Sequence, residues 1–134
     1  MLIVIFSALG LIHIYWAVTR RTARSAIVPT TGGERAFEPS RGATLLVAAA
    51  LGAAVVVIAG ELGWIGTTLP RTVFRLMTFV ISLLFLMRAI GDFRLVGFFK
   101  PASDSSFAYW DSRLFSPLCL FIALAAFIVM WNPV

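Results

Sequence analysis

Hydrophobic residues in this chain are gathered into four long runs, and polar and turn-forming residues fill the segments between them. The runs cover Met1–Val18, Ala43–Ile58 with an extension to Trp64, Val73–Ile90 and Leu114–Trp131. Each contains about 16 to 22 residues, close to the roughly 20 helical residues that cross the hydrocarbon core of a bilayer. The pattern therefore predicts an all-α polytopic membrane protein in which residues 1–134 form one bundle of four transmembrane helices. These helices are expected at about residues 1–20, 43–64, 72–92 and 112–131.

Composition supports this interpretation, because 60% of the residues are hydrophobic and only 13% are charged. A soluble domain has about 45–50% apolar and about 25% charged residues, so this chain has too few charges to cover the surface of a soluble globule. The first run has the length of a signal peptide, but no positive charge precedes it and Arg20, Arg21 and Arg24 follow it directly. We therefore expect it to be retained as the first helix.

Positive charges are distributed unequally between the segments that flank the predicted helices. The net charge is +5, and nine of the 11 lysine and arginine residues fall in or beside the loops after the first and third runs. With four spans these two loops share one side of the membrane, and the other side has only Arg71 and Arg75. Loops rich in lysine and arginine stay in the cytoplasm, so we expect an extended cytoplasmic loop between helices one and two and both termini outside. The expected partners are anionic membrane lipids and not nucleic acid, because no layout of basic and aromatic residues typical of a nucleic-acid reader is present.

Polar residues within and beside the helices are expected to collect on the cytoplasmic side. The first and third helices both run inward, which brings their ends and the start of the fourth helix to the same membrane face. Arg88 and Asp92 lie one helical turn apart at the end of the third helix and are therefore neighbours. The candidate ligand-binding residues on this side are His13, Arg88, Asp92, Arg94, Asp111 and Arg113.

Two interpretations of these residues remain open. His13 is either a neutral histidine that is hydrogen-bonded inside the bundle or a group that contacts a ligand or handles protons. Arg88 and Asp92 either form an ion pair that ends the helix at the interface, or line a basic pocket in which Asp92 positions Arg88. In such a pocket Arg88 and Arg94 would bind a phosphate or carboxylate, since a guanidinium group pairs with both in a bidentate manner.

On the predicted outer side, Glu61 and the two arginines at the start of the third helix flank the short second loop. Arg71 and Arg75 can neutralise a carboxylate across such a loop. We therefore expect Glu61, Arg71 and Arg75 to form a structural ion pair.

Recognised catalytic signatures are absent from the sequence, which has no glycine-rich phosphate loop after a strand, no Cys/His metal spacing and no GxSxG. No catalytic residue, metal or cofactor is therefore assigned, and a single cysteine excludes an internal disulfide. The polar cluster favours a non-enzymatic binding or transport-type module, or an accessory subunit of a larger membrane complex, with a site for an anion or lipid headgroup. Four short helices are few for a solute pathway, so transport would require a homo-oligomer. The alternative is a small membrane enzyme that acts on a lipidic or isoprenoid substrate, with His13 and Asp92 or Asp111 handling protons.

Four segments of the chain are similar to a known family. They are "HIYWA", "VPTTGGERAFEPSRGATLLVA", "RAIGDFRLVGFFK" and "FAYWDSRLFSPLCL", which together are spread over nearly the whole length. In these segments the chain resembles the small bacterial integral-membrane family called domain of unknown function 3995 (DUF3995). The resemblance implies a four-helix protein of the bacterial inner membrane, and it implies no reaction, ligand or catalytic residue.

Overall fold

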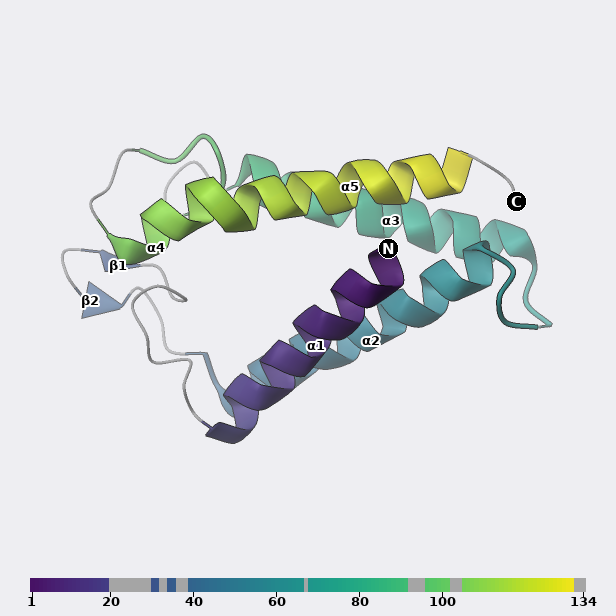
Figure 1. Ribbon diagram of the computed structural model, residues 1–134, viewed down its shortest axis with the longest axis horizontal. Helices are drawn as coiled ribbons and strands as arrows, with labels where there is room; N and C mark the ends of the chain where they lie inside the picture. The colour runs from purple at the N-terminus through teal and green to yellow at the C-terminus, as the bar shows by residue number, and fades with distance from the viewer. Residues whose placement is uncertain are drawn as a thin grey trace.

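The computed structural model describes residues 1–19, 30–31, 34–35, 39–66, 68–91, 96–101 and 105–131. Within this part of the chain the helices are α1 (Leu2–Thr19), α2 (Arg41–Glu61), α3 (Arg71–Ile90), α4 (Ser106–Trp110), the π-helical η2 (Asp111–Phe115) and α5 (Ser116–Trp131). The last three follow one another without a break and form one long helix (Figure 1). Two strands, β1 (Thr30–Thr31) and β2 (Glu34–Arg35), pair antiparallel between α1 and α2.

The predicted fold class is confirmed, because four helices are long and apolar enough to cross a membrane. They contain 18, 21, 20 and 26 residues, counting Ser106–Trp131 as one span. A bilayer requires every backbone polar group of a span to be bonded internally, and a helix of this length meets that requirement. The chain is therefore a multi-pass membrane protein.

The fourth helix begins at Ser106, earlier than the expected residue 112. Its start is capped by Ser105, whose side-chain oxygen accepts a hydrogen bond from the N–H of Ala108 at 3.1 Å. A serine at this position bonds one of the N–H groups that the first helical turn leaves without a partner. The segment "SFAYW", which precedes the expected start of the fourth helix, is helical for this reason.

The helices pack as two hairpins. α1 lies mainly along α2, and α3 lies mainly along α5, while contacts between the two pairs are fewer and involve mostly α2 and α3. Figure 1 shows that the hairpins lie close together where α2 leads into α3 and diverge toward the end that carries α4. We call the first of these the closed end of the bundle and the second the open end.

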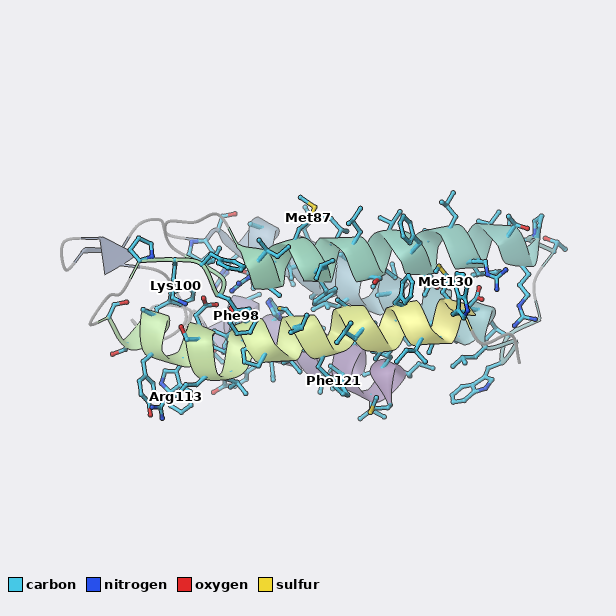
Figure 2. The ribbon with its side chains drawn as sticks, turned by 90° about the horizontal axis from the view of Figure 1, so that it is seen from above. Met87, Phe98, Lys100, Arg113, Phe121 and Met130 are labelled. Carbon is cyan, nitrogen blue, oxygen red and sulfur yellow. The ribbon has the colours of Figure 1, made fainter. Side chains whose placement is uncertain are left out.

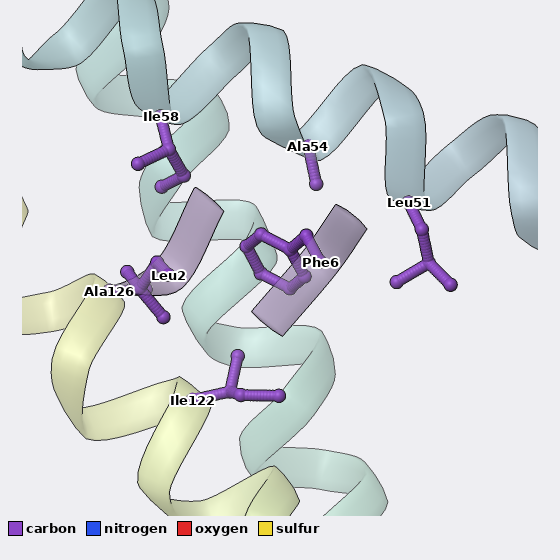
Figure 3. Packing of buried hydrophobic residues seen from close by; sticks show 7 residues of the cluster. All are labelled: Leu2, Phe6, Leu51, Ala54, Ile58, Ile122 and Ala126. Carbon is purple, nitrogen blue, oxygen red and sulfur yellow. The ribbon is translucent and has the colours of Figure 1, made fainter. Parts of the chain in front are cut away.

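The core where the hairpins meet is apolar, and its buried residues come from α1, α2 and α5 while Phe85 of α3 packs against them (Figure 3). Phe6 of α1 is fully buried, and its ring lies 5.6 Å from that of Phe85 in α3. In lipid the hydrophobic effect does not drive helices together, so this close packing holds the hairpins instead. The buried cluster consists of Leu2, Phe6, Leu51, Ala54, Ile58, Ile122 and Ala126.

The outer surface of the helices is apolar as well. Large side chains such as Met87 and Phe121 are exposed and point away from the helix pair (Figure 2). A soluble protein avoids such large exposed apolar patches, whereas a membrane span requires them. This surface therefore faces lipid, and the charged side chains that the structure describes on the helices lie toward the two ends of the bundle.

Candidate functional site

The candidate site lies at the open end, where the chain leaves α3 and turns back before α4. Gly91 ends α3 with φ of 88°, and its N–H bonds to the carbonyl oxygen of Met87 at 2.8 Å. Further along, the N–H of Phe98 bonds to the carbonyl oxygen of Ala89 at 2.9 Å, which returns the loop to the end of the helix. Gly97, with φ of 91°, packs against Gly91 so closely that a Cβ on either glycine would overlap main-chain atoms. These conformations require glycine at both positions.

Asp111 is the centre of the site, with an exposed fraction of 0%. Its Oδ1 accepts a hydrogen bond from Arg88 Nη2 of α3 at 2.8 Å. Its Oδ2 accepts two more, from Lys100 Nζ at 2.7 Å and from the N–H of Gly97 at 2.8 Å. One carboxylate thus ties together the end of α3, the returning loop and the start of the last helix.

Lys100 is held in place by three acceptors, which matches the three hydrogens of an ammonium group. Besides Asp111, Nζ donates to the carbonyl oxygen of Gly97 at 3.0 Å and to Ser112 Oγ at 2.8 Å. Its side chain is only 6% exposed, and Figure 2 shows it between the ends of α3 and α4. Lys100 is therefore fully engaged and is not available to a ligand in this arrangement.

Arg88 differs from Lys100, because only part of its guanidinium group is engaged. Nη2 bonds to Asp111, whereas Nη1 is buried and has no hydrogen-bond partner among the described residues. The Arg88 side chain as a whole is 34% exposed. Two cations share one carboxylate, so the cluster of Arg88, Lys100 and Asp111 carries one excess positive charge beside an N–H group that lacks an acceptor.

The π-helical turn η2 places Asp111 in this position. The N–H of Ser116 bonds to the carbonyl oxygen of Asp111, five residues back, and Pro117, which has no N–H, follows. A π turn aligns residues five apart, whereas in an α-helix they point to different sides. Asp111 and Ser116 are accordingly both fully buried, and the Ser116 hydroxyl has no hydrogen-bond partner among the described residues.

Arg113 and His13, two of the predicted ligand-binding residues, lie outside this cluster. Arg113 is on the exposed side of η2, where its guanidinium group lies 4.5 Å from the centre of the Tyr109 ring and Nη1 donates to the Tyr109 hydroxyl at 3.0 Å. His13 is half-buried on α1, and its Nδ1 lies 2.7 Å from the carbonyl oxygen of Leu9. Because a carbonyl only accepts, Nδ1 carries a hydrogen. His13 lies on α1 and therefore belongs to the other hairpin, which diverges from α4 at the open end (Figure 1).

Asp92 and Arg94 lie outside the described residues, and their predicted roles stay predictions. The predicted site missed Lys100 and Gly97, which contribute two of the three hydrogen bonds to Asp111. One sequence feature set Lys100 apart: it is the only lysine in the chain, and the other ten of the 11 lysine and arginine residues are arginines. Gly97 contributes through its backbone, which no side-chain pattern reveals.

At the closed end, the arginines expected to pair with Glu61 bond to main-chain carbonyls. Arg71 Nη2 donates to the carbonyl oxygen of Glu61 at 3.3 Å, and Arg75 donates to that of Met130 through Nε at 3.2 Å and Nη2 at 2.9 Å. The last carbonyls of a helix lack intrahelical donors and attract cations. The Glu61 carboxylate itself is buried, and neither oxygen has a hydrogen-bond partner among the described residues.

Within the part of the chain that the structure describes, no group of three or more His, Cys, Asp or Glu side chains is close enough to hold a metal ion. No curated protein and no solved structure matches the chain. The model of one family, described as protein of unknown function (DUF3995), matches residues 6–126, which include every residue of the site described above. The chain therefore belongs to the DUF3995 family.

Proposed function

We propose that the cluster of Arg88, Lys100 and Asp111 binds the anionic headgroup of a membrane phospholipid, and that the protein is a binding module and not an enzyme. The observation that carries this proposal is the buried Nη1 of Arg88, which has no hydrogen-bond partner among the described residues. A buried donor without an acceptor costs about 1–3 kcal/mol. A phosphate oxygen would supply that acceptor and would also neutralise the excess positive charge of the cluster.

Arg88 is well prepared for such a ligand. Asp111 fixes the guanidinium group through Nη2 at 2.8 Å, so its orientation is set before a ligand arrives. Because the side chain as a whole is 34% exposed, a headgroup can approach it from the membrane interface, and a local movement would then bring the buried Nη1 into contact with the ligand. A planar guanidinium that is already oriented loses little entropy on binding and suits phosphate.

The surroundings favour a lipid over a small soluble anion. Met87, next to Arg88, and Leu114 of η2 are both exposed and apolar. Tyr109 and Trp110 are exposed at the same end, and such rings prefer the headgroup layer. A phospholipid would place its phosphate at Arg88 and its acyl chains along these apolar side chains.

The contacts of Asp111 and His13 argue against the enzymatic alternative in which these two residues act together, and Asp92, the other partner considered for His13, lies outside the described residues. A general base must reach its substrate, but Asp111 is fully buried and accepts three hydrogen bonds. His13 lies on the other hairpin, with its ring 5.1 Å from that of Trp16 on the same helix. Neither group is arranged to exchange a proton with the other.

The distribution of lysine and arginine supports a location for the site on the cytoplasmic side of the bacterial inner membrane, with both termini outside. Anionic lipids are available on that side. A lipid bound between two copies of this chain, or between this chain and other subunits of a larger complex, is compatible with a role as an accessory subunit.

Native mass spectrometry tests this proposal. Protein extracted in mild detergent and reconstituted with mixed phosphatidylglycerol and phosphatidylcholine should retain phosphatidylglycerol. Arg88→Ala and Arg88→Lys should each lower the retained fraction at least several-fold, and Arg88→Lys keeps the charge needed to balance Asp111. Arg113→Ala is the matched control, because that arginine lies at the same end but contacts only Tyr109 among the described residues.

Equal retention by wild type and both Arg88 variants would refute the proposal. Inorganic phosphate, added to lipid-free protein in detergent, separates the two sources of the same chemistry. If phosphate binds in an Arg88-dependent manner and phosphatidylglycerol does not, the ligand is a soluble phosphate and the lipid assignment is wrong.

A further inference from the structure

The closed end of the bundle contains a carboxyl group in a different situation from Asp111. Glu61 is the last residue of α2, is 2% exposed, and has no hydrogen-bond partner for either carboxylate oxygen among the described residues. Asp111, by contrast, accepts three hydrogen bonds. Nothing in the proposed lipid site uses Glu61, which lies at the opposite end of the helices.

The charged groups near Glu61 are directed elsewhere. Arg71 of α3 reaches the Glu61 main chain, at 3.3 Å, and Arg75 reaches Met130 of α5. The described residues of α5 include no charged side chain, and α1 approaches this region with Leu2 and Phe6. These two arginines therefore bond to helix carbonyls, and hydrogen bonds to the carboxylate are left unmade.

Close packing between α2 and α3 keeps Glu61 in this position. Gly60 precedes it, and a Cβ at Gly60 would overlap the ring of Phe74, which is itself buried. The absence of a side chain lets the two helices approach, and the approach buries the next residue. Glu61 therefore lies at the contact through which the two hairpins are joined.

An ionised carboxylate is unfavourable in this setting for two reasons. Burial without donors removes its hydration, which is strongly unfavourable for an ion. In addition, the C-terminal end of a helix carries partial negative charge, which repels a nearby anion. A carboxyl group that holds a proton avoids both costs.

We propose that Glu61 is a proton-binding site: its carboxyl group holds a proton while α2 and α3 are packed together, and it exchanges that proton with water at the closed end. The path for exchange is short, because α2 ends at Glu61 and the following residues Gly63–Gly66 are exposed. Loss of the proton would create a buried anion at the joint between the hairpins, and the anion would favour their separation. The packing of the hairpins is thereby coupled to proton binding.

A lipid-soluble carbodiimide tests the proposal directly, because it reacts with carboxyl groups that are protonated and in an apolar environment. The carboxyl O–H adds across one C=N bond, so that an O–C bond forms and the proton passes to nitrogen; the adduct then rearranges to a stable N-acylurea without loss of atoms. At neutral pH, dicyclohexylcarbodiimide should add one mass equivalent to the full chain in detergent. Peptide mapping should place it on Glu61 and on none of the other five acidic residues.

Two variants and one infrared measurement make the result decisive. Glu61→Gln should abolish labelling and should keep or raise Tm, because glutamine resembles the protonated form. Asp111→Asn should leave labelling unchanged, which separates this inference from the lipid site. The infrared C=O stretching band of a protonated carboxyl should be present in wild type and missing in Glu61→Gln.

Three outcomes would overturn the proposal. Absence of labelling in wild type would show an ionised or inaccessible carboxylate. A large fall in Tm for Glu61→Gln would show that the negative charge stabilises the fold, as in an ion pair with Arg71. Protection from labelling by sodium or potassium ions at constant pH would identify a metal-cation site instead.

Discussion

Replacing Asp111 by asparagine tests how much of the stability of the α3/α5 hairpin depends on one buried charge. Asparagine keeps the size of the side chain but removes the negative charge and one of the two acceptor oxygens. The oxygen that remains can serve either Arg88 or the pair formed by Lys100 and the N–H of Gly97, and the amide NH₂ must then face another donor. Lys100, only 6% exposed, loses its counter-ion.

The expected loss follows from these contacts. Removing one partner of a buried ion pair costs about 3–5 kcal/mol, because the other charge stays buried without compensation. Hydrogen bonds to charged groups are each worth about 1.5–3 kcal/mol, and three of them that share one carboxylate are not additive. We therefore expect Asp111→Asn to lower the free energy of unfolding by about 3–5 kcal/mol.

Reversible unfolding of purified protein in mixed micelles of a mild detergent and dodecyl sulfate measures this difference. Ser112→Ala is the control, since Ser112 is exposed and water can replace its single hydrogen bond to Lys100 at 2.8 Å. It should cost about 1 kcal/mol or less. A loss below about 1 kcal/mol for Asp111→Asn, no larger than that of the control, would refute the reasoning.

A double-mutant cycle separates the lost charge from other effects of the substitution. Lys100→Met removes the buried cation, so the combination with Asp111→Asn leaves only the partly exposed Arg88 charged. The double variant should be more stable than Asp111→Asn alone, with a coupling energy in the range of about 0.5–3 kcal/mol. Strict additivity would mean that the two groups do not stabilise one another.

The remaining predictions concern glycines and use the same unfolding assay. Gly97→Ala should be more destabilising than Gly63→Ala. Both residues have positive φ, at 91° and 70°, which costs alanine about 1–2 kcal/mol. Of the two, Gly97 is the one at which the Cβ of alanine would also overlap main-chain atoms at the end of α3. Equal losses would mean that the loop can move away from the helix. Gly60→Ala should destabilise because its Cβ would overlap the Phe74 ring, whereas Gly52→Ala, which meets open space, should be neutral or stabilising. A neutral Gly60→Ala would show that the contact between α2 and α3 is not tight.

The fold class could be predicted from the sequence because a bilayer imposes one strong condition. Spans must be helical and apolar over a fixed length, and the four hydrophobic runs of the sequence meet that condition. The start of the fourth helix was not predictable in the same way. It depends on Ser105 as a cap and lies in a segment that mixes polar and aromatic residues, which lacks the apolar pattern of a span.

The site was predictable only in part, because sequence spacing identifies neighbours on one helix and little else. Arg88 and Asp111 were both recognised as candidates, but the observed pairing spans 23 positions. It depends on the loop that returns over the end of α3 through Gly91 and Gly97, both with positive φ. Such a long-range contact follows from tertiary structure, and the i, i+4 rule cannot show it.

Polar contacts between helices are concentrated in one of the two hairpins. Along α3 and the last helix, Arg75 bonds to Met130 near the closed end, Ser82 Oγ donates to the carbonyl oxygen of Ala123 at 2.8 Å in the middle, and Arg88 bonds to Asp111 at the open end.

The other contacts are mainly apolar: α1 meets α2 where Gly10 packs against Leu51, and the hairpins meet around Phe6. Since lipid competes well with apolar contacts but poorly with hydrogen bonds and ion pairs, the α3/α5 hairpin should persist when the two hairpins separate. The cluster around Asp111 is built entirely from that hairpin and its loop, so its geometry does not require α1 or α2. If both proposals hold, a headgroup bound at Arg88 would be retained even while the joint at Glu61 opens, and the two ends of the protein would respond to lipid and to protons independently.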